Sequence, residues 1–235
     1  MAVLKWDESG KKWIHTGVEK VTLRNFGTGT PGVGGTCAAW NGVTALSVSP
    51  SGAEVTKLYA DNIIYMEMMS VETVGASIEA YNFPKEFETC NGIKTIAEFI
   101  KVKGQKRTPF SLAWRTKEQY DTQEEHDILH ILYNCLAAPS EVSNATISDS
   151  PEAVTFSWEI SCTPLPEFTL MKGSTAEKFK NVYKFDIDLT KWAANAPETK
   201  ELDDLLAVFE TSDDETGWTP AALAAAGFIN GYSAS

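Results

Sequence analysis

Hydrophobic and polar residues alternate most regularly over residues 182–189 (VYKFDIDL), which predicts a strand with one buried and one solvated face. Segments 108–116, 126–136 and 153–162 are rich in β-branched and aromatic residues and are bounded by Pro, Asp or Ser, as strands usually are. Weaker strand patterns cover residues 13–23, 38–48, 63–69 and 74–83. The chain is therefore predicted to be mainly β, a sandwich or open barrel of roughly seven to nine strands with a few helices.

Helical spacing is confined to short segments. Leu202, Leu205 and Phe209 recur at helical intervals and predict an amphipathic helix of about three turns. Residues 93–102 carry the same spacing over about two turns, so we expect a second helix there. A third short helix is expected at residues 221–226.

Two long segments are predicted to be loops. Residues 26–36 contain five glycines and one proline, and residues 47–62 have a loop-like composition. Loops of this length within a compact domain are usually functional or disordered. No linker is evident, so we expect a single domain over residues 1–235 that ends in an acidic, partly helical segment at about 191–235.

The charge of the chain argues against a surface that grips nucleic acid. Twenty Lys and Arg residues are outnumbered by 32 Asp and Glu residues, which gives a formal net charge of −12 at pH 7. Proteins that hold the phosphate backbone depend on a basic patch, so DNA near this chain is expected to be repelled. No stretch approaches the roughly 18–20 consecutive apolar residues of a membrane span, so no membrane insertion is expected. The four scattered cysteines form no C-x-x-C pair and are expected to be buried, reduced thiols, as in proteins made in the cytosol.

His126 and His130 are the strongest candidates for chemistry. Two imidazoles four residues apart would bind zinc on a helix, but this segment has a strand pattern and no third ligand stands out. The simpler interpretation is a strand with one half-buried and one exposed histidine. Cys90, Cys135 or Cys162 would need a histidine as base to act as a nucleophile, and nothing in the sequence favours any of the three. We therefore expect no enzymatic activity, no cofactor and no metal.

Short motifs follow one another through residues 37–190. They are WNGV (40–43), SPSGAE (49–54), YADN (59–62), EAYNFPKEF (79–87), CNG (90–92), GQKR (104–107), WRT (114–116), LHILY (129–133), APSE (138–141), DSPEAVTFSWE (149–159) and TP (163–164). Over about two thirds of the chain, this series resembles the major tail protein of long-tailed bacteriophages (siphoviruses), the subunit of the tail tube. The family commonly has a small residue, often Gly, after the Leu-Tyr of LHILY, where this chain has Asn134.

The resemblance implies a set of residues that maintain the structure of the family. In this chain they are Pro84, Phe87, Gly104, Gln105, Arg107, Phe110, Arg115, Thr116, His130, Tyr133, Pro139, Ser140, Asp149, Ser150, Pro151, Glu152, Trp158, Glu159 and Pro164. For two of them, Arg107 and Arg115, we expect ion pairs with Asp61 or Glu159, more simply within one subunit than between subunits.

The same resemblance implies two packed antiparallel β-sheets with a flanking helix, in subunits that form hexameric rings stacked into a hollow tube. It implies a place in the virion, as a conduit for DNA ejection, after synthesis in the cytoplasm of the host bacterium. The implied partners are other copies of the chain, the tape measure protein, the tail terminator, the baseplate or initiator proteins, and viral double-stranded DNA that passes without specific binding. Two alternatives stay open: the tube of a contractile tail or secretion system and, in a different class, a glycan- or receptor-binding β-sandwich.

Two groups of residues are candidates for contacts in such a tube. Asp186 and Asp188 are candidates for an acidic lumen, although a strand on the outer surface fits them equally well. The segment 47–62 is expected to order against the next ring. Its candidate stacking residues are Ser51, Gly52, Ala53, Glu54, Val55, Thr56, Tyr59, Asp61 and Asn62.

Overall fold

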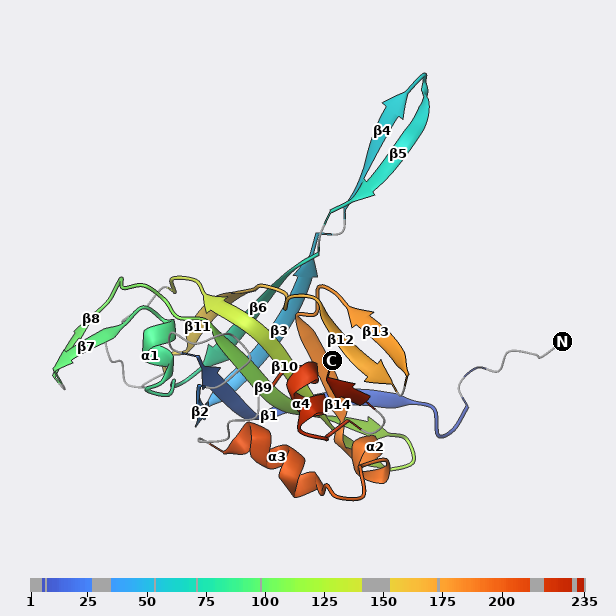
Figure 1. Cartoon of the computed structure of the whole chain (residues 1–235). Helices are drawn as coiled ribbons and strands as arrows, with labels where there is room; N and C mark the ends of the chain where they lie inside the picture. Colours follow the sequence, from blue (N-terminus) through green and yellow to red (C-terminus); the bar gives the residue numbers. More distant parts are fainter. Residues whose placement is uncertain are drawn as a thin grey trace.

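The structure is a computed structural model that describes residues 6, 8–26, 35–52, 54–70, 72–97, 99–140, 153–172, 174–211, 218–229 and 232–234. Within this part, eight strands form a main antiparallel sheet (Figure 1). They are β1 (Trp13–Asn25), β2 (Thr36–Ala39), β3 (Val43–Ser51), β6 (Thr73–Ala80), β9 (Phe110–Tyr120), β10 (Glu125–Ala137), β11 (Phe156–Cys162) and β14 (Lys184–Asp188). Their order is β2-β1-β9-β10-β11-β6-β3, and β14 pairs with the first part of β10.

The remaining elements cover the sheet or project from it. The helices are α1 (Phe87–Cys90), α2 (Leu189–Ala194), α3 (Leu202–Glu210) and α4 (Pro220–Ala225). A small sheet contains β12 (Phe168–Lys172), β13 (Thr175–Phe179) and β15 (Tyr232–Ala234). Two hairpins, β4 (Val55–Ala60) with β5 (Ile63–Met69) and β7 (Lys94–Ala97) with β8 (Ile100–Val102), point away from the body in different directions (Figure 1).

The main sheet folds over a core of its own. Ile78 of β6, Leu112 of β9 and Trp158 of β11 are buried in one hydrophobic cluster that also includes residues of β1 and β10. Strands from distant places in the sheet order, β1 and β3, contact each other, so the sheet is strongly curved. Such curvature is that of an open barrel. The expected mainly β fold of antiparallel sheets with a few helices is confirmed.

A second core lies on the opposite face of the same sheet. Because side chains alternate between the faces of a strand, Ile131 and Tyr133 of β10 point away from the first core. They pack with Phe209 of α3, Leu223 of α4 and the fully buried Trp218. The predicted helix at 202–209 and the predicted short helix at 221–226 are confirmed, and their apolar faces cover the sheet.

Two sequence predictions about local structure are wrong. Residues 93–102 form the β7–β8 hairpin instead of a helix, because two turns of helical spacing are too short to separate a helix from two short strands. Residues 47–62 are not a loop: β3 extends to Ser51 and β4 begins at Val55. Of the other predicted loop, residues 27–34 lie outside the described part, and Thr36 already belongs to β2.

The position after Leu132-Tyr133 has a structural reason to avoid bulky residues. The pairing of β10 with β9 shifts between Leu132 and Cys135, and Asn134 takes the left-handed conformation there, with a φ of 44°. Gly and Asn adopt this conformation more readily than other residues. Asn134 therefore suits the bulge at this position.

Candidate assembly interface

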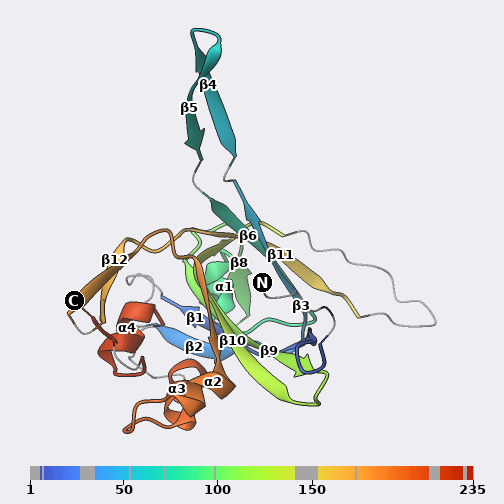
Figure 2. The ribbon, with the colours of Figure 1, turned by 90° about the vertical axis from the view of Figure 1, so that its right-hand side faces the viewer.

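The β4–β5 hairpin continues the β3–β6 ladder beyond the edge of the main sheet. The β3–β6 ladder ends at the pair Ser51 and Thr73, and Gly52 follows with a φ of 93°. Pairing resumes when Ser70 N donates to Glu54 O and Glu54 N donates to Ser70 Oγ, both at 3.0 Å. In both views of the ribbon the hairpin stands clear of the rest of the chain (Figures 1 and 2).

The tip of this hairpin is a two-residue turn. Asp61 and Asn62 both have positive φ, at 51° and 63°, and they connect the paired residues Ala60 and Ile63. Two consecutive left-handed residues are the mark of a type I′ turn, whose twist matches that of the flanking strands. The turn therefore closes a regular hairpin, which explains how a segment that was predicted to be a loop forms a strand.

The register places different side chains on the two faces of the hairpin. Lys57 and Glu67 are paired directly and form an ion pair of 3.2 Å on one face, which we call the mixed face. Leu58 and Met66 are paired on the other, which we call the apolar face. Alternation along β4 adds Thr56 and Ala60 to the apolar face, and their cross-strand partners on β5, Met68 and Ile63, join it, because the register shifts by one residue between Leu58 and Tyr59.

The hairpin exposes far more apolar surface than a hairpin in water normally tolerates. Ile63 is 65% exposed, Tyr65 73% and Met69 71%. The full set of exposed large hydrophobic residues is Val55, Leu58, Tyr59, Ile63, Ile64, Tyr65, Met66, Met68 and Met69. A two-stranded hairpin on its own is at best marginally stable, and a large exposed apolar patch marks an interaction site.

The size of the patch indicates how much free energy is gained when a partner covers it. Fully burying an exposed Val, Leu, Ile or Met side chain contributes about 1.5–3 kcal/mol, and the nine side chains are already about half covered, so burying half of them would contribute on the order of 5 kcal/mol. Association itself costs about 4–15 kcal/mol. One hairpin contact is therefore close to balance, and stable assembly through this surface requires several such contacts made together.

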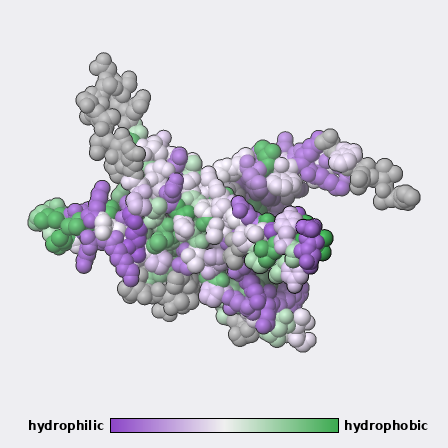
Figure 3. Space-filling view, turned by 90° about the horizontal axis from the view of Figure 1, so that it is seen from above, coloured by the Kyte–Doolittle hydropathy of each residue, from purple (hydrophilic) through white to green (hydrophobic). Residues whose placement is uncertain are grey.

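The β7–β8 hairpin is a second projecting apolar element. Phe99, between its strands, is 86% exposed, and Ile96 and Ile100 are exposed beside it. Figure 3 shows this hairpin at the left edge of the molecule, with an apolar tip and hydrophilic side chains behind it. Two exposed apolar elements thus leave the body on different sides.

The candidate lumen acids are held by histidines. The Asp186 Oδ1 atom lies 2.5 Å from Nδ1 of His130. The other ring nitrogen of His130, Nε2, lies 2.7 Å from Thr116 Oγ1. Asp188 lies 3.4 Å from His126 Nδ1 and accepts a hydrogen bond of 2.9 Å from Lys191 N at the start of α2. These pairs tie β9, β10, β14 and α2 together.

Charge and burial act in opposite directions on these carboxyl groups. Burial raises the pKa of Asp186, but hydrogen bonds and charge from His130 and Lys184 outweigh it and hold the pKa below its ordinary value. For Asp188, burial is likewise outweighed by bonds from Lys191 and His126, so its pKa is also lowered. Both groups are thus stabilised as carboxylates by partners of their own chain.

The solvent exposure predicted for the two aspartates and the two histidines is partly wrong. The Asp186 side chain is 48% exposed, but that of Asp188 is only 17% exposed, because it caps α2. Likewise His126 is half-buried and His130 buried, so neither is the exposed histidine that the sequence suggested. Whether either aspartate faces a lumen stays a prediction.

Several of the family-motif residues meet in the first core. Phe87 of α1 lies 5.5 Å from Phe110 and 5.2 Å from Trp158 between ring centroids. Pro84 O accepts a hydrogen bond of 3.0 Å from Phe87 N at the start of α1. Glu159 O accepts one of 2.7 Å from Ala138 N, just before Pro139 and Ser140, while Asp149, Ser150, Pro151 and Glu152 lie outside the described residues.

Among the described residues neither arginine forms the predicted ion pair with Asp61 or Glu159 within the chain, and such pairs between subunits stay a prediction. Arg115 pairs with Glu210, the last residue of α3, instead of Asp61 or Glu159. Arg107 Nε is buried without a hydrogen-bond partner in the part of the chain that the structure describes. Burial has the largest effect on the pKa of Arg115 and lowers it below its ordinary value, although the charges of Asp127 and Glu19 act to raise it. The ion pair of Arg115 with Glu210 joins the sheet to the acidic C-terminal segment.

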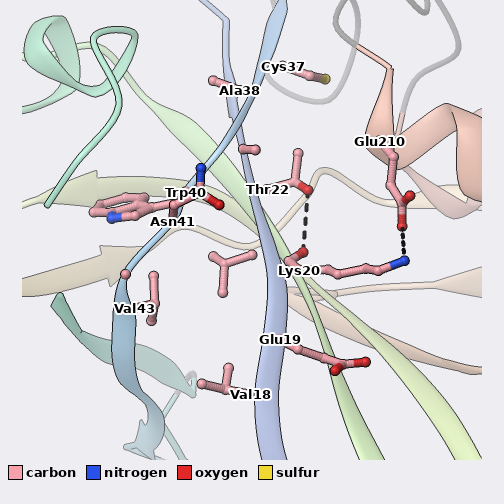
Figure 4. Close-up of a pocket in the computed structure, with 13 residues that line it drawn as sticks. Val18, Glu19, Lys20, Thr22, Cys37, Ala38, Trp40, Asn41, Val43 and Glu210 are labelled. Atoms are coloured by element: carbon pink, nitrogen blue, oxygen red, sulfur yellow. Dashed lines mark hydrogen bonds and ion pairs between the residues drawn. The ribbon is translucent and has the colours of Figure 1, made fainter. Parts of the chain in front are cut away.

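A hollow of about 640 Å³ beside β1 and β2 offers little chemistry (Figure 4). Its lining contains one thiol, Cys37, and no histidine. Lys20 and Glu210 pair with each other across it at 3.7 Å, on the side away from Trp40. Glu19 is the remaining charged side chain of the lining.

Three further features of the described residues concern metal binding, the cysteines and membrane insertion. Their histidines, cysteines and carboxylates form no group of three or more that could hold a metal ion. All four cysteines are buried thiols, as predicted. In the same residues no helix combines the length and apolar character needed to cross a membrane.

Comparisons with known proteins leave the family open. No protein-family model matches the chain, and no curated protein matches its sequence. Among solved structures, a chain of the sheath–tube complex of an extracellular contractile injection system, in its extended state, superimposes with a TM-score of 0.26 and 12% identity. The match covers 72% of this chain and 88% of that chain. A TM-score of this size does not establish a common fold, so function has to be inferred from the surface of the chain itself.

Proposed function

We propose that this protein is a self-assembling structural subunit of a phage-type tail tube. The observation that carries the proposal is the β4–β5 hairpin, which projects from the body with a largely exposed, largely apolar face. A surface of this kind favours a partner present in many copies, and the simplest such partner is the chain itself. The protein acts in this proposal by assembly and not by catalysis.

The tube of this proposal consists of hexameric rings stacked by the β4–β5 hairpin, as the resemblance to siphovirus tail tube subunits implies. The hairpin of each subunit lays its apolar face against the adjacent ring. The free-energy cost of association balances a single hairpin contact, but six contacts made together overcome it. The tube of a contractile tail or secretion system is the alternative within the same class, and a sheath gene beside the gene of this protein would favour it.

The charge of the chain suits a conduit for DNA. Each subunit carries −12, and double-stranded DNA carries a charge about every 1.7 Å of its axis. Acidic groups in the lumen would repel phosphates, within a range of about 8 Å at physiological ionic strength. DNA would then pass towards the host cell without adhering. In the virion, the tape measure, terminator and baseplate or initiator proteins are the further partners of this proposal.

The two faces of the hairpin provide a matched test. Leu58→Ser with Met66→Ser removes one directly paired couple from the apolar face, and Lys57→Ser with Glu67→Ser removes the neighbouring couple from the mixed face. We expect purified wild type and the mixed-face variant to sediment as tubes visible by negative-stain electron microscopy. The apolar-face variant should remain in the supernatant with an unchanged thermal unfolding temperature, since the hairpin stands clear of the body. Equal sedimentation of both variants would refute stacking through the apolar face.

A further inference from the structure

The β7–β8 hairpin is joined to the body by a rigid base. Gly92, with a φ of 71°, accepts a hydrogen bond of 3.0 Å from Gln105 N, and Gly92 N donates to Thr89 O at 3.2 Å. A Cβ atom at Gly92 would lie 2.7 Å from Gln105 O, so only glycine fits there. Lys101 also pairs with Glu88 of α1. The hairpin therefore leaves the body in a fixed direction, and we call residues 93–106 the arm.

The arm is basic in an otherwise acidic chain. It carries four lysines, Lys94, Lys101, Lys103 and Lys106, and a single acidic residue, at position 98. Lys94, Lys103 and Lys106 are exposed and form no ion pair with any residue that the structure describes. Together with the exposed Phe99 between the two strands, they form a cationic and apolar surface. Figure 3 shows the apolar tip of this hairpin and the hydrophilic surface behind it.

On another side, the same chain presents exposed acidic groups, whose charge is opposite to that of the arm. Glu198, just before α3, and Asp203, in its first turn, are exposed, and among the described residues no basic side chain pairs with either of them. Residues 186–215 contain ten acidic residues and two lysines. The arm and α3 are well separated in Figure 1, so an arm does not reach the α3 helix of its own chain.

From this complementarity we infer that the arm docks against the α3 side of a second copy of the chain. The contact joins two different surfaces, and head-to-tail contacts of this kind close into rings when the rotation between copies permits. It is thus a lateral contact within a ring, whereas the β4–β5 hairpin connects rings. The inference rests on the proposed self-assembly and names the surfaces through which neighbours in a ring meet.

Zero-length cross-linking tests this contact directly. A carbodiimide joins lysine amines to carboxylates that touch, and an equal mixture of ¹⁵N-labelled and unlabelled full-length protein distinguishes links between copies from links within one. We expect mixed-isotope peptides that connect Lys103 or Lys106 with Glu198 or Asp203. Mixed-isotope links that join other surfaces and omit the arm would overturn the inference. This measurement does not require tubes, so it reads the lateral contact even where stacking fails.

Charge reversal gives the second test. Lys103→Glu with Lys106→Glu places like charges against α3, so we expect at least about a tenfold loss of these cross-links and of sedimenting tubes. Adding Glu198→Lys with Asp203→Lys in the same chain should restore both. The control Lys85→Glu with Lys172→Glu changes the net charge equally at two exposed lysines outside the arm that form no ion pair with any described residue, and should assemble as wild type. Normal assembly of the arm variant, or no restoration by the second pair, would overturn the inference. Absence of wild-type tubes beside intact arm cross-links would count against the tube alone.

Discussion

The hydroxyl of Tyr133 donates a hydrogen bond of 2.6 Å to the carbonyl oxygen of Trp218, within the buried core between the main sheet and the C-terminal helices. Trp218 Nε1 in turn donates to Val208 O of α3 at 2.9 Å. Burial raises the pKa of Tyr133 well above its ordinary value, so the hydroxyl is protonated and can donate at neutral pH. These two bonds hold the acidic C-terminal segment against β10.

Removal of this donor should destabilise the fold. Tyr133→Phe leaves a buried carbonyl oxygen without a partner, which costs about 1–3 kcal/mol. We expect a loss of this size in the free energy of unfolding, measured by urea denaturation. Tyr65→Phe, which removes a hydroxyl from an exposed ring, should change it by less than about 0.5 kcal/mol. A Tyr133→Phe protein as stable as wild type would show that the bond contributes nothing.

The base of the arm provides a comparison of two glycines. Gly92 and Gly104 both have positive φ, at 71° and 82°, but a Cβ at Gly104 would meet nothing within 4 Å. Gly104→Ala should therefore cost only the backbone strain, about 1 kcal/mol, whereas Gly92→Ala adds a clash with Gln105 O. We expect Gly92→Ala to be the more destabilising substitution in thermal unfolding. Equal effects would mean that the arm shifts without cost and is not held rigidly.

Deletion of the β4–β5 hairpin should separate folding from stacking. The β3–β6 ladder ends at Ser51 and Thr73, so replacing residues 52–72 by Asn-Gly would close a two-residue hairpin turn directly on the sheet. We expect a folded protein with wild-type circular dichroism in the far ultraviolet after allowance for the lost strands, and no tubes by electron microscopy. Tubes of normal length from this variant would show that the hairpin is not the stacking element.

Stability should fall in acid through the Asp186 carboxylate. Its pKa is below its ordinary value in the folded chain, so it stabilises the fold above pH 3.8 and this contribution disappears as the pH falls below that value. Between about pH 5 and pH 2, wild type should therefore lose more stability than Asp186→Asn, in urea titrations at each pH. Asp203→Asn, which alters an exposed carboxylate without an ion pair among the described residues, serves as the control. Parallel curves for wild type and Asp186→Asn would rule out the contribution.

The elements that could be predicted from the sequence are those with one buried and one solvent-exposed face. Strands β9, β10 and β11 and helix α3 pack one side against a core, so their hydrophobic periodicity is visible. The β4–β5 hairpin has no dry face in the isolated chain, and β4 consequently lacks a clear alternation. The available signal was the Asp61-Asn62 pair before the predicted strand 63–69, which is typical of a hairpin turn.

Contacts between distant segments could not be predicted. Arg115 pairs with Glu210, 95 residues away, and no spacing rule connects a sheet residue with the end of a helix. The resemblance to tail tube subunits indicated residues 51–62 as a contact segment, and residues 55–60 of it form β4, on a hairpin with an exposed apolar surface. That this segment makes contacts between copies stays a prediction, whereas its predicted loop conformation is wrong.

In the proposed tube, the β4–β5 hairpin joins copies of this chain from one ring to the next. Cryo-electron microscopy of material assembled from the purified full chain tests it most directly. We expect a hollow tube of stacked rings in which Leu58 and Met66 of each hairpin are buried against the adjacent ring. Single, unassembled chains at every protein concentration, or a tube whose hairpins extend into solvent, would contradict it.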